Sequence, residues 1–477
     1  MKPTKEQQDI IKRFTEVDIL KVNAVAGSGK SSTLAMLAYA NPVSSLYLAF
    51  NKAVADEAKE NFPDHVDCRT THSLAFSGFG RNLAHKLKRP KKYRNVAGTS
   101  SETAKFYKIN DIHGEDEEVV NATSIASAVR ATVQRYEQSD DLALESKHLP
   151  WHQIKEILEK KPTIDKQKVD KEILKVAKKL WDDRIDPSSP VLTTHDTYLK
   201  LWQLSNPTIH YDIIYLDEAQ DTNPVVLDVV RKQKCKVVYV GDTFQSIYQF
   251  RGATNAMESV IAPAMLLTMS FRYGDEIANV ARKIIKGAID VKGNPKVKSQ
   301  VSEIDSGKPF TKLFRTNSAL FSEAVDMLKD GLKVKCEVDT SNYIRMLESA
   351  ENLYRGNTKD VKHEEMTPFS TWDDLLLAAK ENPELARISK TVVSGAVGLF
   401  KTQLKKVERH EGNADVILTT AHKSKGRQWD QVVIAEDFRD LKDIWENDNQ
   451  QEINLLYVAV TRAVNTLELP EGILKEL

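Results

Sequence analysis

The chain has 477 residues, of which 41% are hydrophobic, and its formal net charge is zero. This length exceeds one ordinary hydrophobic core, so roughly two to four domains are expected. No run of about 18 apolar residues occurs, which argues against a membrane span, and the N-terminal residues lack the apolar stretch of a signal peptide. Cys68, Cys235 and Cys336 are too widely spaced for a metal-ligand pair and suit a reducing compartment. Zero net charge does not favour a nucleic-acid binder, although sliding along a strand requires only a local positive track.

The first part of the chain, up to residue 83, has the pattern of an α/β fold. Short apolar runs predict strands at 19–25 and 45–50, and apolar residues three or four apart predict helices at 32–39 and 53–62. From residue 84 to 189 the sequence is polar, charged and mostly helical in pattern, which indicates an insertion.

Strand signals return at 213–217 and 236–241, and both runs end in acidic residues. Parallel α/β sheets bind ligands at such strand ends. A second α/β segment begins after Arg272, and residues 341–407 form a second helical, irregular insertion. The expected elements of this second α/β segment are a strand at 311–314, a helix at 320–328, strands at 416–420 and 431–436, and a closing segment at 455–463.

The segment AVAGSGKS, residues 24–31, reads as a phosphate loop between a strand and a helix. Gly27 and Gly29 let backbone amides turn toward phosphate oxygens at a helix N-terminus. Lys30 would supply charge to the β- and γ-phosphates, and Ser31 a hydroxyl for Mg²⁺. A glycine-rich surface turn is the alternative, and the strand–loop–helix context argues against it. The residues expected to bind nucleotide here are Ala26, Gly27, Ser28, Gly29, Lys30, Ser31 and Ser32.

Two acids follow the apolar strand that ends at Leu216. Asp217 would hold Mg²⁺ through water, and Glu218 would orient and deprotonate the attacking water as general base. Acids that simply favour a helix N-terminus are the alternative interpretation. Together with the phosphate loop, this pair predicts an ATP hydrolase.

Further segments indicate which kind of hydrolase this is. Segment 241–253, GDTFQSIYQFRGA, resembles motif III of the UvrD/Rep-like superfamily 1 DNA helicases. Segments 419–426 and 456–463 look like their motifs V and VI, 4–7 like the adenine-reading Q motif, and 270–272 like motif IV. Within this superfamily the chain is most similar to the F-box DNA helicase group, on segments 194–201, 314–317 and 429–430. No F-box precedes Thr4, so no ubiquitin-ligase role is implied.

The resemblance implies a role for each matching residue. Gln7 would hydrogen-bond adenine, Phe271 would stack on it, and Gln245 would sense the γ-phosphate. Arg272 and Arg462, both expected from the second α/β half, would be arginine fingers that reach the nucleotide when the cleft closes. For each arginine the alternative is a surface ion pair.

Two positions depart from the family pattern. Gln428 replaces a glutamate that is expected to contact the nucleotide sugar, so it would bind there without charge. Phe250 stands where the family usually has tryptophan.

Single strands are held by aromatic stacking and phosphate contacts. The resemblance implies DNA contacts for Phe50, Asn51, Thr71, His72, Tyr248, Phe250, Arg251 and His422. Phe50 as a core residue and His72 as a buried histidine are the alternatives. The basic run 86–94 would be either part of the DNA track or a solvated face.

We therefore expect the α/β class, with two tandem RecA-like P-loop NTPase domains that each carry a mostly helical insertion. The first domain is expected at 1–83 and 190–263, with its insertion at 84–189. The second is expected at 264–340 and 408–477, with a small insertion at 341–407.

The expected function is ATP-dependent 3′-to-5′ translocation on single-stranded DNA with unwinding of duplex, using ATP and Mg²⁺. One alternative is a translocase that strips proteins or remodels recombination intermediates and unwinds weakly, which the small second insertion favours. Another is a nucleotide-dependent switch without motor action. The expected partners are single-stranded DNA, junctions between single and double strands, and recombination or single-strand-binding proteins, with no membrane. The expected location is the cytoplasm of a bacterium or of a virus's host, or a eukaryotic nucleus.

Overall fold

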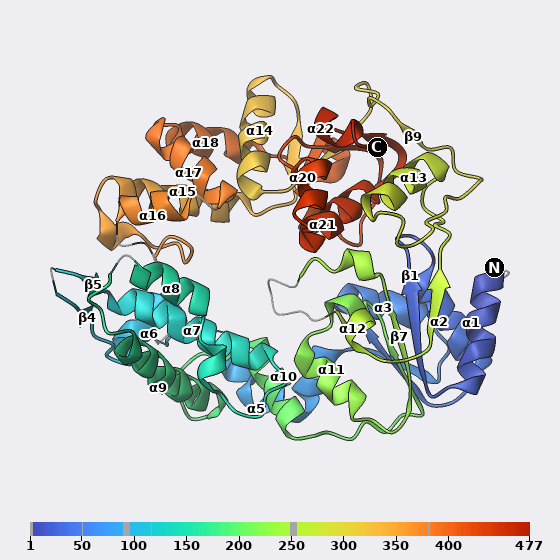
Figure 1. The fold of residues 1–477 in the computed structure, drawn as a ribbon, viewed down its shortest axis with the longest axis horizontal. Coiled ribbons are helices and arrows are strands. Elements are labelled where there is room, and N and C mark those ends of the chain that lie inside the picture. Colours follow the sequence, from blue (N-terminus) through green and yellow to red (C-terminus); the bar gives the residue numbers. More distant parts are fainter. Residues whose placement is uncertain are drawn as a thin grey trace.

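The computed structural model describes residues 3–49, 51–88, 96–115, 117–159, 161–248, 255–367, 369, 371–379 and 382–477. Two α/β units lie one above the other, and a helical region lies beside each of them (Figure 1). Both predicted α/β halves and both predicted helical insertions are therefore present.

The first unit is built on a parallel six-stranded sheet. Its strands, in spatial order, are β3 (Val66–Thr70), β2 (Ser45–Ala49), β6 (Ile213–Leu216), β7 (Lys236–Gly241), β1 (Ile19–Ala24) and β8 (Ala264–Leu267). Every residue of β2 and β6 is buried, as expected for strands covered on both faces. The acidic residues that follow β6 and β7 therefore come together at one edge of this sheet.

Strand β8 corrects the expected boundary between residues 263 and 264. It pairs with β1, with Lys21 opposite Ala264 and Ala24 opposite Leu267. The first unit thus extends at least to Leu267. The short segment AMLL carries little pattern of its own, and only its pairing with β1 assigns it to the first sheet.

The helices of the first unit connect its strands and cover the sheet (Figure 1). They are α1 (Lys5–Glu16), α2 (Lys30–Ala40), α3 (Lys52–Asn61), α4 (Thr71–Ala75), α5 (Arg81–Leu83), α10 (His195–Leu204), α11 (Pro224–Arg231) and α12 (Ala256–Ser259). Helix α1 starts at a capping box, in which Thr4 and Gln7 each bond the other's backbone N–H. That motif fixes the position of Gln7 beside α2.

The first insertion has its own hydrophobic core, built from residues between Ala97 and Val191. Its elements are α6 (Ser100–Phe106), β4 (Ile112–His113), β5 (Val119–Val120), α7 (Ala122–Gln138), α8 (Trp151–Glu159) and α9 (Lys166–Ile185). A buried ion pair joins its helices, since Arg184 Nη1 lies 2.8 Å from Glu137 Oε2. An independent core explains why this region could be inserted without disturbing the first sheet.

The second unit is a second parallel six-stranded sheet. Its strands, in spatial order, are β11 (Val334–Cys336), β12 (Val416–Thr420), β10 (Phe310–Phe314), β13 (Trp429–Ile434), β14 (Ala463–Glu468) and β9 (Gln300–Val301). Its helices are α13 (Asp275–Ile284), α14 (Asn317–Lys329), α19 (Ala421–Ser424), α20 (Leu441–Glu446), α21 (Gln450–Val460) and α22 (Glu471–Leu474).

The second insertion shares its core with the second sheet, because residues from Phe314 to Ala435 form one cluster. Its helices are α15 (Thr340–Tyr354), α16 (Trp372–Ala378), α17 (Pro383–Val393) and α18 (Val397–Gln403). The two insertions lie next to each other (Figure 1), and Arg130 Nη2 of the first lies 3.9 Å from Glu364 Oε1 of the second.

Candidate nucleotide site

The phosphate loop follows β1 and leads directly into α2. Gly27 and Gly29 have φ angles of 78° and 79°, a left-handed conformation that strongly favours glycine. A Cβ on Gly27 would also lie 2.7 Å from Ser270 Oγ and 2.8 Å from Arg272 Cβ. The loop therefore needs glycine for its backbone conformation and for its close packing against segment 270–272.

The candidate adenine pocket lies beside Gly29. Gln7 is 3% exposed, and its amide nitrogen donates to Thr33 Oγ1 at 3.0 Å. Phe271 keeps 40% of its surface exposed, and a Cβ on Gly29 would meet its ring at 3.4 Å and the Gln7 amide at 3.8 Å. The structure thus brings Gln7 and Phe271, which are far apart in sequence, to the same end of the phosphate loop.

The acid pair follows β6. Asp217 is 5% exposed, and one of its oxygens accepts from the Tyr47 hydroxyl at 2.6 Å. Glu218 has a φ of 51°, which is uncommon outside glycine and turns its side chain toward the phosphate loop. Lys30 Nζ donates to Glu218 Oε1 at 2.9 Å. The phosphate-loop lysine and the predicted general base are therefore direct partners in this structure.

Burial and charge act in opposite directions on these groups. Burial raises the pKa of Asp217, and the neighbouring Glu218 carboxylate raises it further. Burial alone would also raise the pKa of Glu218, but Lys30 and Lys425 outweigh it and hold that pKa below its usual range. Burial alone would lower the pKa of Lys30, but Glu218 and Asp217 raise it. The site consequently holds ionised Lys30 against ionised Glu218.

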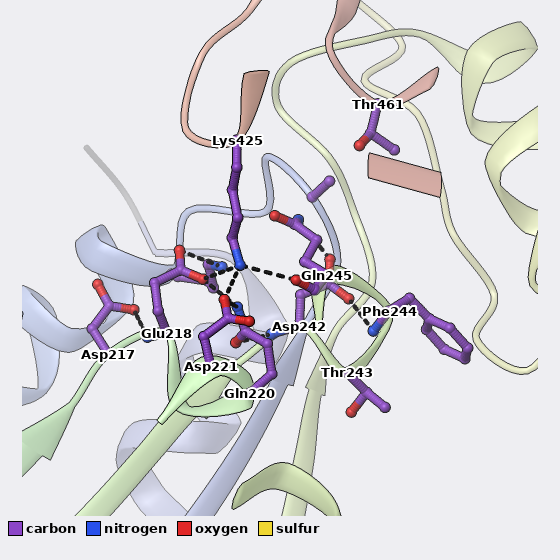
Figure 2. Close-up of polar contacts among 12 residues, drawn as sticks. Asp217, Glu218, Gln220, Asp221, Asp242, Thr243, Phe244, Gln245, Lys425 and Thr461 are labelled. Atoms are coloured by element: carbon purple, nitrogen blue, oxygen red, sulfur yellow. Dashed lines mark hydrogen bonds and ion pairs between the residues drawn. The ribbon is translucent and has the colours of Figure 1, made fainter. Parts of the chain in front are cut away.

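A hydrogen-bond network joins the ends of β6 and β7. The Gln220 amide nitrogen donates to Glu218 Oε2 and, at 3.2 Å, to Asp221 Oδ2. Its oxygen accepts from the backbone N–H of Asp242 at 3.0 Å, and Asp242 Oδ2 accepts from Gln245 Nε2 at 2.8 Å. Gln245, the predicted phosphate sensor, therefore bonds Asp242 directly and is connected to Glu218 and Asp221 through Asp242 and Gln220 (Figure 2).

Lys425, immediately after α19, reaches from the second unit into this network (Figure 2). Its ammonium pairs with Asp221, donates to the Gln245 carbonyl at 2.9 Å, and lies 3.8 Å from Glu218 Oε2. This lysine had no predicted role, although it stands inside segment 419–426, which resembles motif V. Its contacts with the first unit arise only because the two units pack against each other.

Two residues of helix α21 in the second unit, Tyr457 and Asn454, supply further contacts. The Tyr457 hydroxyl donates to Asp242 Oδ2 and accepts from the Ala26 N–H, both at 3.2 Å. Burial and Asp242 raise the pKa of Tyr457 well above its usual value, so the hydroxyl stays protonated. The Asn454 amide donates to the Ser246 carbonyl at 2.9 Å. Tyr457 thus joins the phosphate loop to the end of β7, and sequence reasoning also missed it.

Arg272 lies closer to the first unit than expected. It follows β8 and packs beside Gly27, so it stands at the connection between the units and not across the cleft. Its guanidinium reaches the second unit, where Nε donates to Gln428 Oε1 at 2.8 Å and Nη1 to the Thr461 carbonyl at 2.7 Å. Gln428, predicted to contact the sugar, is here a partner of Arg272.

Arg462 is a buried residue of the second unit, only 1% exposed, which excludes the surface ion-pair alternative. Its guanidinium donates to the carbonyl of Val458 at 2.8 Å, the carbonyl of Arg427 at 3.2 Å and the hydroxyl of Thr461 at 3.1 Å. Burial lowers its pKa to about 9, and the nearby Arg272 charge adds to this effect. The two predicted fingers are therefore neighbours that both bond Thr461, and Arg272 is the one that lies beside Gly27 of the phosphate loop.

The site suits a magnesium nucleotide. Ser28 Oγ is buried in the loop and has no hydrogen-bond partner among the described residues. Among those same residues, no three His, Cys, Asp or Glu side chains cluster as a complete metal site. Mg²⁺ commonly binds through one or two carboxylates together with substrate phosphates, so Asp217 and Ser31 beside this loop fit that ion.

The predicted DNA contacts are described in part. Phe50, Phe250 and Arg251 lie outside the described residues. Asn51 caps α3 by accepting from the backbone N–H of Val54, and Thr71 is the first residue of α4. Both follow strands of the first sheet, at the edge where the acids also lie.

His72 is half-exposed, which excludes the buried-histidine alternative. Its side chain is 42% exposed, and Nε2 lies 3.5 Å from Asp196 Oδ1. Burial alone would raise the pKa of Asp196, but His72 outweighs it and lowers that pKa. The His72 ring also meets Tyr198 edge to face, at a centroid distance of 6.2 Å.

Tyr248 and His422 come from different units and meet between them. The Tyr248 hydroxyl donates to the His422 carbonyl at 3.0 Å, and the ring centroids are 6.3 Å apart. The basic run at 86–94 is described only through Lys88. Lys86 is 3% exposed and donates to the Asp183 carbonyl at 2.6 Å at the end of α9, so it has no place in a DNA track.

Residues 4–259 match the UvrD/REP helicase N-terminal domain, and residues 415–468 match the UvrD-like helicase C-terminal domain. The first match covers more than half of the chain, so the protein belongs to the UvrD/Rep helicase family. The predicted family and the predicted pair of RecA-like domains are confirmed.

The chain is 31% identical to F-box DNA helicase protein 1 of Schizosaccharomyces pombe, over 99% of this chain and 58% of that protein. It is also 31% identical to F-box DNA helicase 1 of Gallus gallus, over 99% of this chain and 49% of that protein. The chain thus spans about half the length of these relatives. Within the described residues, no helix combines the length and the apolar character that a bilayer crossing requires.

Proposed function

We propose that the chain is an ATP-driven motor that translocates 3′-to-5′ on single-stranded DNA and unwinds duplex. The observation that carries this proposal is the composition of the nucleotide site. The first unit supplies the phosphate loop and the acids, and the second unit reaches both through Lys425 and Tyr457. A site shared by two domains couples its occupancy to their relative position.

The first unit binds the nucleotide in this proposal. Gln7 and Phe271 hold adenine, the backbone amides from Ala26 to Ser32 hold the phosphates, and Lys30 leaves Glu218 to contact them. Asp217 and Ser31 hold Mg²⁺, which neutralises phosphate charge when bound. The buried, unpartnered Ser28 hydroxyl and the left-handed glycines support this assignment.

Hydrolysis uses residues from both units. Glu218 takes the proton from the attacking water, and Gln245 orients groups at the terminal phosphate. Arg272 and Arg462 neutralise charge that develops there, which requires them to exchange their carbonyl partners for phosphate oxygens. The position of Arg272 beside Gly27, and the contact of both arginines with Thr461, support this role.

The strand crosses the edge of both sheets in this proposal. Asn51, Thr71 and His72 contact it on the first unit, and Tyr248 and His422 contact it where the units meet. The half-exposed rings of His72, Tyr248 and His422 suit base stacking. The Tyr248 ring centre lies 5.6 Å from the Lys425 ammonium, which suits coupling to the nucleotide site.

The test compares ATP hydrolysis with and without single-stranded DNA, and then unwinding of forked, 3′-tailed and 5′-tailed fluorescent duplexes. The proposal expects strong DNA stimulation and unwinding of the forked and 3′-tailed substrates. Stimulation without unwinding would favour the protein-stripping translocase. Hydrolysis that DNA does not stimulate would favour a nucleotide switch and contradict the motor.

The same proposal includes the partners of the protein and its location in the cell. Junctions between single and double strands are the preferred DNA, with recombination or single-strand-binding proteins as protein partners. Both named relatives come from eukaryotes, which supports the nucleus over the bacterial or viral alternative.

A further inference from the structure

Lys425 is the one residue of the second unit that contacts the predicted general base and its neighbouring acid among the described ion pairs. Its side chain is only 10% exposed, and it faces carboxylates of the first unit on one side and the Gln245 carbonyl on another. A buried ammonium remains charged only where such partners surround it. The position is therefore held by specific polar contacts.

The contacts of Glu218 show what this ammonium restrains. Lys30 occupies Oε1 at 2.9 Å, while the Gln220 amide and Lys425 share Oε2. A base needs a carboxylate oxygen that faces the water it activates. Phosphate would draw Lys30 away from Oε1, but the nucleotide offers no comparable reason for Lys425 to leave Oε2 and Asp221. A second event is needed to release Glu218.

The same lysine also contacts the predicted DNA platform. Its ammonium lies 5.6 Å from the centre of the Tyr248 ring, and the Tyr248 hydroxyl bonds the carbonyl of His422, three residues before Lys425. His422, a proposed DNA contact in α19, and Lys425, the residue that follows α19, therefore lie on one short segment. A DNA strand that displaces Tyr248 or His422 is therefore expected to displace the Lys425 ammonium as well.

We propose that Lys425 is the positioning residue through which single-stranded DNA controls hydrolysis. It holds Glu218 and Asp221 in a restrained arrangement, and DNA bound at Tyr248 and His422 withdraws it so that Glu218 can face water. This inference rests on the proposed function, because it assigns the control of the same site. It requires Lys425 to restrain the DNA-free enzyme and not to drive its chemistry.

The experiment measures kcat and KM for ATP, with and without single-stranded DNA, in the full chain and in Lys425→Met. Removal of one charge-assisted contact is expected to raise DNA-free kcat about tenfold and to shrink DNA stimulation by a similar factor. The KM for ATP stays within about twofold, because binding depends on the phosphate loop. A loss of both DNA-free and stimulated activity would overturn the inference, since Lys425 would then be a catalytic cation.

Three variants separate restraint from folding. Lys425→Arg keeps the charge and is expected to restore low DNA-free activity, whereas Lys423→Met removes a nearby exposed charge and leaves both rates unchanged. Lys425→Gln repeats the test if the methionine variant does not fold, which thermal melting reports. If the arginine variant is as active without DNA as the methionine variant, the restraint is not electrostatic and the inference fails. A parent chain without DNA stimulation would instead overturn the proposed function itself.

Discussion

The two α/β units have the same sheet architecture but contribute opposite chemistry to the site. The first unit carries the phosphate loop and the acids Asp217, Glu218, Asp221 and Asp242 at its strand ends. The second unit contributes cations, namely Lys425, which pairs with Asp221, and the buried Arg462. Its strand ends carry no glycine loop of this kind in the described residues.

This difference indicates a division of labour. A unit rich in buried carboxylates can bind a magnesium nucleotide but needs cations to neutralise the charge of the transition state. When such a cation comes from a second body, as proposed for Arg462, the rate depends on the distance between the bodies. The proposed role of Lys425 is instead to restrain Glu218. The following predictions would sharpen or break this comparison, beginning with the largest expected effect.

Arg462→Lys tests the contribution of the second unit. Lysine keeps the charge but lacks the planar guanidinium that binds phosphate oxygens through two N–H groups. The rate of hydrolysis is therefore expected to fall, by up to the roughly 10³- to 10⁵-fold that an arginine finger contributes. Nucleotide affinity should fall only modestly, because Lys30 remains. The measurement is single-turnover hydrolysis alongside equilibrium nucleotide binding. Full hydrolysis with full DNA stimulation would mean that Arg462 serves only to bind the carbonyls of Val458 and Arg427.

Glu218→Gln tests the contribution of the first unit. Removal of the general base is expected to slow hydrolysis by about 10²- to 10⁴-fold, while ATP and DNA binding persist because Asp217 and Lys30 remain. Steady-state hydrolysis and fluorescent nucleotide binding, measured on one preparation, separate the two effects. Turnover near that of the parent chain would remove Glu218 from its assigned role.

Tyr457→Phe tests the contact between the units. Loss of the hydroxyl leaves the Ala26 N–H without its described hydrogen-bond acceptor and removes one of the donors to Asp242, so the free energy of unfolding is expected to fall by about 1–3 kcal/mol. Chemical denaturation measures this change. Tyr211→Phe is a comparison variant, because its hydroxyl bonds Asp67 within the first unit only. An equal fall in the free energy of unfolding in both variants would argue against a special role for Tyr457.

Tyr248→Ala tests the proposed strand platform. Loss of a stacking ring is expected to weaken single-strand binding by about 1–3 kcal/mol, with DNA-free nucleotide affinity unchanged. Fluorescence anisotropy with a labelled oligonucleotide measures the affinity, and thermal melting checks the fold. Unaltered DNA affinity would restrict Tyr248 to packing between the units.

The fold was predictable where sequence pattern is strong. The expected strands 236–241 and 416–420 coincide with β7 and β12, and both are apolar runs in the middle of a sheet. The short strands β3, β8, β9 and β11 were not expected, because two to five residues carry little periodic signal. The closing segment at 455–463 spans the end of α21 and the start of β14, since a largely apolar segment does not distinguish helix from strand.

The residues of the site likewise fall into those that local sequence predicts and those that only the tertiary structure brings together. The phosphate loop and the pair Asp217–Glu218 are local signals, because a strand, a turn and the following residues fix their geometry within a few positions. The sequence by itself therefore determined the family, and it predicted the nucleotide and the groups proposed to hold it. Only the tertiary structure decided that Lys425 pairs with Asp221, that Tyr457 reaches Ala26, and that Arg272 belongs beside Gly27. These contacts join residues that are far apart in the chain. They depend on how the second unit packs against the first, which no local sequence pattern encodes.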